Sequence, residues 1–145
     1  MTSLESPSIS IPKRRLATWH RTLIVVLSLG LYLVSFAAPF DGNCAGLGVF
    51  WVGMLFCWYV FYTLSWWANV LYWVALAYFF AKRWSAAAKW GLSAAALGGA
   101  FIFWDARAAE ALAFQLWVGS MALLAVGAMW LAAREVGSRP QTAEE

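Results

Sequence analysis

The stretch from residue 42 to residue 81, between Asp41 and Lys82, carries no formal charge, and it limits the fold more than any other feature. As one continuous helix it would extend about 60 Å, because a helix rises about 1.5 Å per residue. The hydrocarbon core of a bilayer is only about 30 Å thick. The stretch therefore crosses a membrane twice, or it crosses once and adds a second segment that enters the bilayer or lies on its surface.

The composition supports a membrane as the solvent. Hydrophobic residues make up 63% of the 145 residues and charged residues 12%, whereas soluble domains have about 45–50% and about 25%. One small domain in water could not bury so much apolar surface. The net charge of +3 comes from basic residues that flank apolar runs, which indicates membrane topology rather than nucleic-acid binding.

Three other apolar runs, at 22–40, 84–104 and 111–133, are each long enough to cross a bilayer. They lie between a polar and basic tail, 1–21, and a polar tail, 134–145, so the membrane domain is predicted at 22–133. A cleaved signal peptide is the alternative for the first run, because Ser35-Phe36-Ala37 resembles a small-x-small cleavage site. The run is longer than the usual apolar region of a signal peptide, which favours a membrane span.

The number of spans follows from the basic residues. Of the ten Lys and Arg residues, an arrangement of four spans with a cytoplasmic N-terminus places all but Arg107 on the cytoplasmic side. Five spans would divide them evenly, against the positive-inside rule. The sequence therefore predicts an all-α membrane protein of a bacterial inner membrane, with four transmembrane helices and both termini in the cytoplasm. The second span is then 64–81, and 47–62 is a re-entrant or interfacial aromatic segment on the periplasmic side.

Asn69 lies inside the second predicted span. An amide within hydrocarbon needs a partner, and a hydrogen bond between helices contributes about 0.6–2 kcal/mol there. We expect Asn69 to tie its helix to a neighbour, with Gln115 in the last span as a candidate partner. The alternative is a polar contact with a ligand or with a helix of another protein.

Small residues recur along the third predicted span. Gly91, Ala95 and Gly99 are spaced at i, i+4 and i+8, which predicts a smooth face that allows close approach of another helix. The last span offers Ser120 and Gly127. Such faces usually serve packing within a protein, and self-association as a homo-oligomer is the alternative.

The eleven tryptophans have two interpretations. Those near the ends of predicted spans suit the aromatic belts at membrane interfaces. Trp66, Trp67, Trp73 and Trp117 are placed deeper, and together with Asn69 they could line a pocket for a lipophilic molecule. The two cysteines, Cys44 and Cys57, are too few for a disulfide scaffold, and whether they are bonded stays open.

Enzyme chemistry has little support in the sequence. His20 is the one histidine, so no pair of imidazoles can hold a haem or a metal within the bilayer. We find no phosphate-binding glycine loop, serine elbow or metal-ligand spacing. The sequence therefore predicts no enzyme, no catalytic residue, no cofactor and no metal.

Two short motifs carry a resemblance. The first is Trp66-Trp67-Ala68-Asn69-Val70-Leu71, which has the pattern W-x-A-N-x-L, and the second is Phe114-Gln115-Leu116-Trp117-x-x-Ser120. Together they resemble a group of small bacterial four-span inner-membrane proteins that carry no established activity. Those proteins usually have a proline after the asparagine, whereas this chain has Val70, so the resemblance does not extend to a proline kink. It implies the four-span architecture and marks Asn69 and Trp117 without implying a function.

These observations lead to one leading hypothesis and two alternatives. The leading one is a non-enzymatic protein that works by helix–helix contact with a membrane partner, as an accessory subunit of a membrane complex. The first alternative is an immunity protein against a membrane-acting toxin. The second is a binder or carrier of a small lipophilic molecule at Trp66, Trp67, Asn69 and Trp117.

Overall fold

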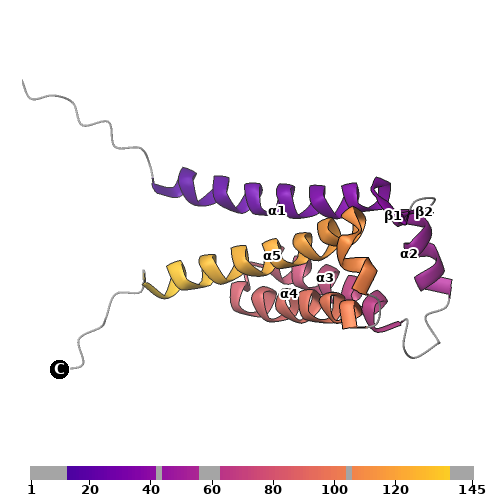
Figure 1. The fold of residues 1–145 in the computed structure, drawn as a ribbon. Coiled ribbons are helices and arrows are strands. Elements are labelled where there is room, and N and C mark those ends of the chain that lie inside the picture. Colours follow the sequence, from indigo (N-terminus) through magenta and orange to yellow (C-terminus); the bar gives the residue numbers. More distant parts are fainter. Residues whose placement is uncertain (1–12, 42–43, 56–62, 104–105, 138–145) are drawn as a thin grey trace, which may run out of the picture.

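The computed structural model describes residues 13–41, 44–55, 63–103 and 106–137, and helices dominate it (Figure 1). Beside the helices there is one short antiparallel ribbon, in which Pro39 pairs with Ala45 and Asp41 with Cys44. In chain order the elements are α1 (Lys13–Ala37), β1 (Pro39–Asp41), β2 (Cys44–Ala45), α2 (Gly46–Leu55), α3 (Thr63–Phe80), α4 (Trp84–Gly99), the 3-10 helices η1 (Ala100–Phe103) and η2 (Ala106–Glu110), and α5 (Leu112–Gly137).

Three stretches of helix in the described residues are long and apolar enough to cross a membrane: Thr18–Ala37, Trp84–Phe103 and Leu112–Gly137. A shorter apolar helix, Trp66–Phe80, lies within α3. Many large apolar side chains on these helices are exposed, as lipid-facing side chains are. The chain is thus a helical, multi-pass protein that sits in a lipid bilayer.

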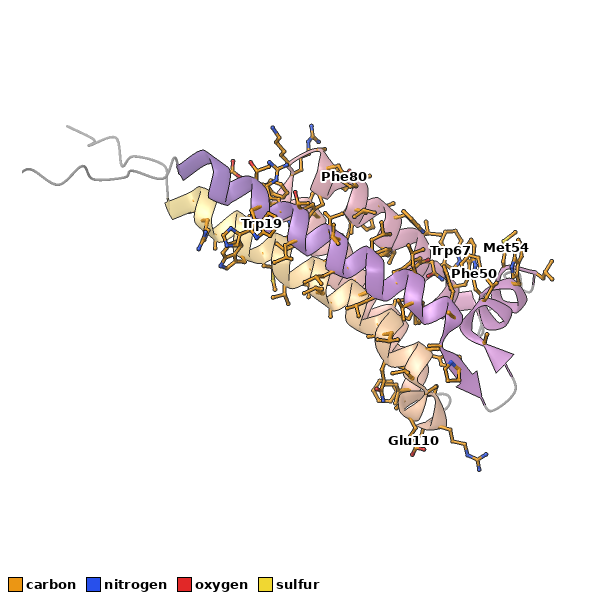
Figure 2. All side chains as sticks on the ribbon, turned by 90° about the horizontal axis from the view of Figure 1, so that it is seen from above. Trp19, Phe50, Met54, Trp67, Phe80 and Glu110 are labelled. Carbon is orange, nitrogen blue, oxygen red and sulfur yellow. The ribbon has the colours of Figure 1, made fainter. Side chains whose placement is uncertain are left out.

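The four long helices lie alongside one another (Figure 1). Helix α5 packs against both α1 and α4, and α4 packs against α3. The start of α1 and the end of α5 lie at the same end of the bundle, whereas α2 and the ribbon cover the end of α1 (Figure 1). Figure 2 shows Trp19 and Phe80 toward the first end and Glu110 at the opposite end.

The described basic side chains are divided unequally between these two ends. The guanidinium of Arg21, near the start of α1, lies 4.7 Å from the ring of Trp84, at the start of α4. Lys82 and Arg83 form the turn just before Trp84, and Arg134 lies near the end of α5, stacked 3.7 Å from the ring of Trp130. Arg107 lies in η2 beside Glu110, at the opposite end (Figure 2). One end is therefore strongly basic, and below we call it the basic end.

Small residues set the distance between α4 and its neighbour α5. A Cβ added to Gly91 would lie 3.1 Å from the Cβ and 3.2 Å from the Cα of Ala125 on α5. Gly99, at the end of the predicted ridge of Gly91, Ala95 and Gly99, takes no part in this contact, because a Cβ there would meet no atom within 4 Å. A spacing of exactly four residues drifts about 40° per step around a helix. The buried face of α4 therefore does not keep to a strict four-residue spacing; its buried residues are Trp84, Ala87, Ala88, Gly91, Ala94 and Gly98.

The turn between α3 and α4 is a Schellman motif. The N–H of Lys82 donates to the carbonyl of Phe79 at 3.1 Å, and the N–H of Arg83 donates to the carbonyl of Tyr78 at 3.0 Å. Lys82 has a φ of 60°, which is the left-handed conformation that glycine usually adopts at this position. A side chain in that conformation costs about 1–2 kcal/mol.

We therefore expect Lys82→Gly to raise the free energy of unfolding by about 1 kcal/mol. Reversible unfolding of the purified protein by SDS in mixed micelles, followed by far-UV circular dichroism, measures this. Lys82→Ala is the control, because it removes the same side chain while a Cβ remains in the left-handed conformation. Equal stabilities of the two variants would contradict the prediction.

Candidate functional site

Asn69 lies at the centre of a buried polar cluster that joins three helices. Only 7% of its surface is exposed. Its side-chain oxygen Oδ1 accepts a hydrogen bond from Trp117 Nε1 on α5 at 2.8 Å and another from the hydroxyl of Tyr32 on α1 at 2.9 Å. One oxygen atom on α3 therefore holds side chains from both α1 and α5.

A second set of hydrogen bonds lies one turn away. Ser28 Oγ on α1 donates to the backbone carbonyl of Ser120 on α5 at 2.9 Å, and it is 2.8 Å from the hydroxyl of Tyr72 on α3. Because a serine hydroxyl has one hydrogen, Tyr72 must donate to Ser28. The hydroxyl of Ser120 itself donates to the carbonyl of Trp117 at 2.6 Å. The same three helices are thus joined twice.

Tyr32 and Tyr72 connect the two sets of hydrogen bonds. Their rings stack with centroids 4.7 Å apart and an angle of 14° between the planes, and their exposures are 1% and 0%. Helices α1 and α3 therefore meet through long aromatic side chains, whereas α4 and α5 meet through a glycine and an alanine. We call Ser28, Tyr32, Asn69, Tyr72, Trp117 and Ser120 the polar core.

Gln115 does not belong to the polar core, so its expected pairing with Asn69 is wrong. Its side chain is exposed, and its Nε2 donates to the carbonyl of Ala109, just before α5, at 2.8 Å. Positions 115 and 117 lie about 200° apart around a helix. Because Trp117 faces α3, Gln115 necessarily faces away from it.

The other tryptophans of the predicted pocket, Trp66, Trp67 and Trp73, all lie on α3. Trp67 and Trp73 each expose about half of their surface, 50% and 48%, and Trp67 meets Trp66 edge to face at 5.9 Å. The indole nitrogen of Trp66 is buried with no hydrogen-bond partner in the described structure. Of the deeper tryptophans, Trp117 is the one that bonds to Asn69.

The sequence reasoning missed Ser28, Tyr32 and Tyr72. A signal for them exists, because each contributing helix carries two polar or hydrogen-bonding side chains one turn apart: positions 28 and 32, 69 and 72, and 117 and 120. That spacing places both side chains of a pair on one face of a helix. Three such pairs in apolar spans predict a shared polar interface.

Part of the predicted aromatic segment can be placed. Helix α2 covers its first part, with Leu47, Trp51 and Leu55 exposed at 47%, 51% and 69%. Residues 56–62 lie outside the described residues, and so does Cys57. The backbone of Cys44 lies in β2, and a bond between the two cysteines lies outside what the structure describes.

The polar core contains only neutral side chains. Among the described residues no group of three or more His, Cys, Asp or Glu side chains is placed to hold a metal ion. Directional hydrogen bonds within lipid fix the rotation of α1, α3 and α5 about their own axes. No protein-family model matches this chain, and neither a curated protein nor a solved structure matches it.

Proposed function

We propose that the chain crosses a bacterial inner membrane four times and has both termini in the cytoplasm. Helix α3 supports a fourth crossing, because its 18 residues extend about 27 Å, close to the thickness of the hydrocarbon core. The basic end, with Arg21, Lys82, Arg83 and Arg134, supports the orientation, since cytoplasmic loops are rich in Lys and Arg.

The function that the geometry supports best is helix–helix contact with a membrane partner, as a non-enzymatic accessory subunit of a membrane complex. The outer face of α4 is the observation that carries this proposal. Ser93 and Ala96 are exposed on it, Ala100 is exposed where η1 continues the helix, and a Cβ at Gly99 would meet nothing within 4 Å. We call these four residues the α4 outer face.

The α4 outer face has smaller side chains than a surface that only meets lipid, with Leu92, which is 46% exposed, beside it one turn before Ala96. Helix α1 shows the usual pattern, with Leu23, Val26, Leu27, Leu33 and Val34 all 43–59% exposed. Apolar association has little driving force in a bilayer, so helices associate through close packing of small residues and through side-chain hydrogen bonds. A face of Gly, Ala and Ser provides both, because the hydroxyl of Ser93 can donate to the backbone of an approaching helix.

The experiment is a pulldown of the tagged protein from native membranes in mild detergent, with mass spectrometry of the proteins that accompany it. We expect a stoichiometric membrane partner with the wild type and at least a tenfold lower yield of that partner with Ala96→Leu. A leucine keeps the partner's backbone from approaching closely, and a tenfold loss corresponds to about 1.4 kcal/mol.

Ala77→Leu is the matched control, since Ala77 is exposed on α3, outside the α4 outer face. It should leave the yield of partner unchanged. The identity of the partner then distinguishes a complex subunit from a toxin neutralised by an immunity protein or from a second copy of this chain. Recovery of the protein alone, or an equal loss with both variants, would refute the proposal.

A further inference from the structure

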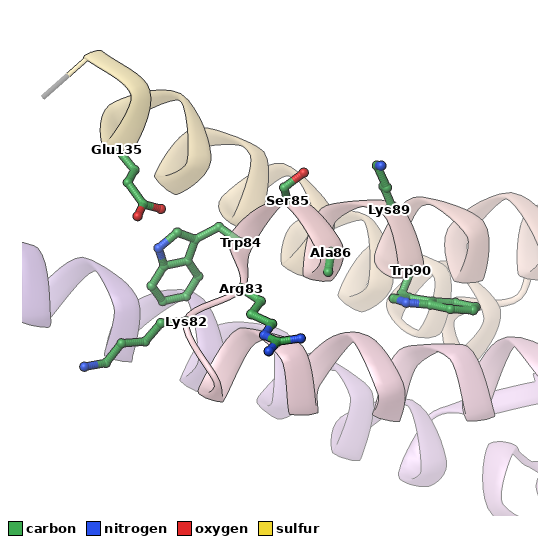
Figure 3. Close-up of a pocket in the computed structure, with 8 residues that line it drawn as sticks. All are labelled: Lys82, Arg83, Trp84, Ser85, Ala86, Lys89, Trp90 and Glu135. Atoms are coloured by element: carbon green, nitrogen blue, oxygen red, sulfur yellow. The ribbon is translucent and has the colours of Figure 1, made fainter. Parts of the chain in front are cut away.

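An open cavity of about 410 Å³ lies at the basic end, where α3 turns into α4 and α5 ends (Figure 3). Its wall holds three basic side chains, two tryptophans and one carboxylate. The lining residues are Lys82, Arg83, Trp84, Ser85, Ala86, Lys89, Trp90 and Glu135. Three cations facing one carboxylate make this an electropositive cavity.

The turn that forms one wall keeps a cation where glycine would cost less. Lys82 adopts a φ of 60°, and backbone strain of this kind clusters at functional and ligand-binding sites. The neighbouring Arg83 is exposed as well. The turn thus contributes two adjacent basic residues to the lining of the cavity.

The first turn of α4 adds to the positive electrostatic potential of the cavity. Arg83 occupies the N-cap position, and its side chain makes no capping hydrogen bond. The positive end of the helix dipole therefore remains available beside the basic side chains. Ser85 and Ala86, in that first turn, line the cavity directly (Figure 3).

The position of the cavity selects among anionic ligands. Apolar side chains continue from it along the outside of the bundle: Trp90 is 40% exposed on α4, and Phe80 is 62% exposed at the end of α3. A free phosphate would use only the cations, whereas a phospholipid would also place its acyl chains against these apolar side chains. Basic sites between membrane helices on the cytoplasmic side bind anionic headgroups in this way.

We propose that this cavity binds the phosphate of an anionic phospholipid headgroup, with Lys82, Arg83 and Lys89 as its cationic contacts. The proposal depends on the basic end lying at a membrane surface and does not depend on a protein partner. Glu135 is the one acidic residue in the cavity wall, and it weakens binding through repulsion of the phosphate.

The test uses the purified full chain in a neutral detergent, titrated with phosphatidylglycerol or with phosphatidylcholine and followed by native mass spectrometry. We expect phosphatidylglycerol to bind more tightly. The double variant Arg83→Gln/Lys89→Gln should bind phosphatidylglycerol about 25-fold more weakly, since each cation near a membrane surface contributes about fivefold. The matched control, Arg107→Gln/Arg134→Gln, removes the same charge outside the cavity wall and should change binding less than threefold.

The variant Glu135→Gln is an independent test that removes no cation. Because it removes a carboxylate that repels the phosphate, we expect it to bind phosphatidylglycerol about threefold more tightly. Circular dichroism verifies that each variant keeps its helix content. Equal binding of the two lipids, or equal losses in the two double variants, would overturn the proposal. Millimolar inorganic phosphate is added in a further titration. If it displaces phosphatidylglycerol completely, the cavity is a simple phosphate site and the lipid is overturned as its ligand.

Discussion

Replacing Asn69 by leucine is expected to lower the free energy of unfolding by about 3 kcal/mol. The substitution removes the one oxygen that accepts from both Trp117 and Tyr32, and it leaves two donors unsatisfied where water does not reach. An orphaned buried donor costs about 1–3 kcal/mol, and hydrogen bonds between membrane helices contribute about 0.6–1.7 kcal/mol each. SDS-induced unfolding in mixed micelles, followed by far-UV circular dichroism, measures the loss.

Two further variants separate the hydrogen bonds from the shape of the side chain. Gln115→Leu should change stability by less than about 0.5 kcal/mol, because Gln115 is exposed and bonds only to the carbonyl of Ala109. The triple variant Asn69→Leu/Tyr32→Phe/Trp117→Phe removes the orphaned donors as well and should regain part of the lost stability. If the triple variant is less stable than Asn69→Leu alone, unsatisfied donors are not the cause of the loss.

Replacing Gly91 by leucine is expected to lower the free energy of unfolding by about 3 kcal/mol or more. A single Cβ at this position would already lie 3.1–3.3 Å from the Cβ, Cα and backbone nitrogen of Ala125. The remaining carbons of a leucine have no space unless α4 moves away from α5, because the atoms that they meet include backbone. The same SDS unfolding measurement, together with the yield of monodisperse protein, reports the effect.

Gly30→Leu is the matched control for Gly91→Leu. Gly30 also lies within a long apolar helix, α1, and a Cβ there would meet no atom within 4 Å. The change should therefore be neutral or slightly stabilising, since glycine disfavours the interior of a helix. Similar losses for the two variants would show that glycine as such, rather than the contact with Ala125, is what the membrane helices require.

The helices were largely predictable from the sequence, and their rotations were not. Long apolar runs between islands of charge placed 22–40, 84–104 and 111–133 close to α1, to α4 with η1, and to α5. The uncharged stretch after Asp41 gave a helix at Thr63–Phe80, near the predicted 64–81. Hydropathy depends on composition along the chain, so it reports where a helix lies and says little about which face meets a neighbour.

The candidate site shows the same division. Asn69 stands out as an amide within an apolar run, and the structure buries it against Trp117. Its other partner, Tyr32, was overlooked because an aromatic residue in a membrane helix reads first as an apolar one. Gln115 was chosen for its chemistry alone, although its angle on α5 relative to Trp117 already excluded it. The residue type identified Asn69 as a side chain that needed partners. The angular position of each residue around its helix decided which partners Asn69 found.

The sharing of a single oxygen by two donors has a consequence for the order of assembly. Helices leave the ribosome in chain order, so α1 and α3 are in the membrane before α5 has been made. During that interval Asn69 can engage Tyr32, but it has no Trp117 to accept from, and Ser28 has no carbonyl of Ser120. Helix α5, which is synthesised after α1 and α3, therefore completes both sets of hydrogen bonds, and neither set is complete until α5 has entered the membrane.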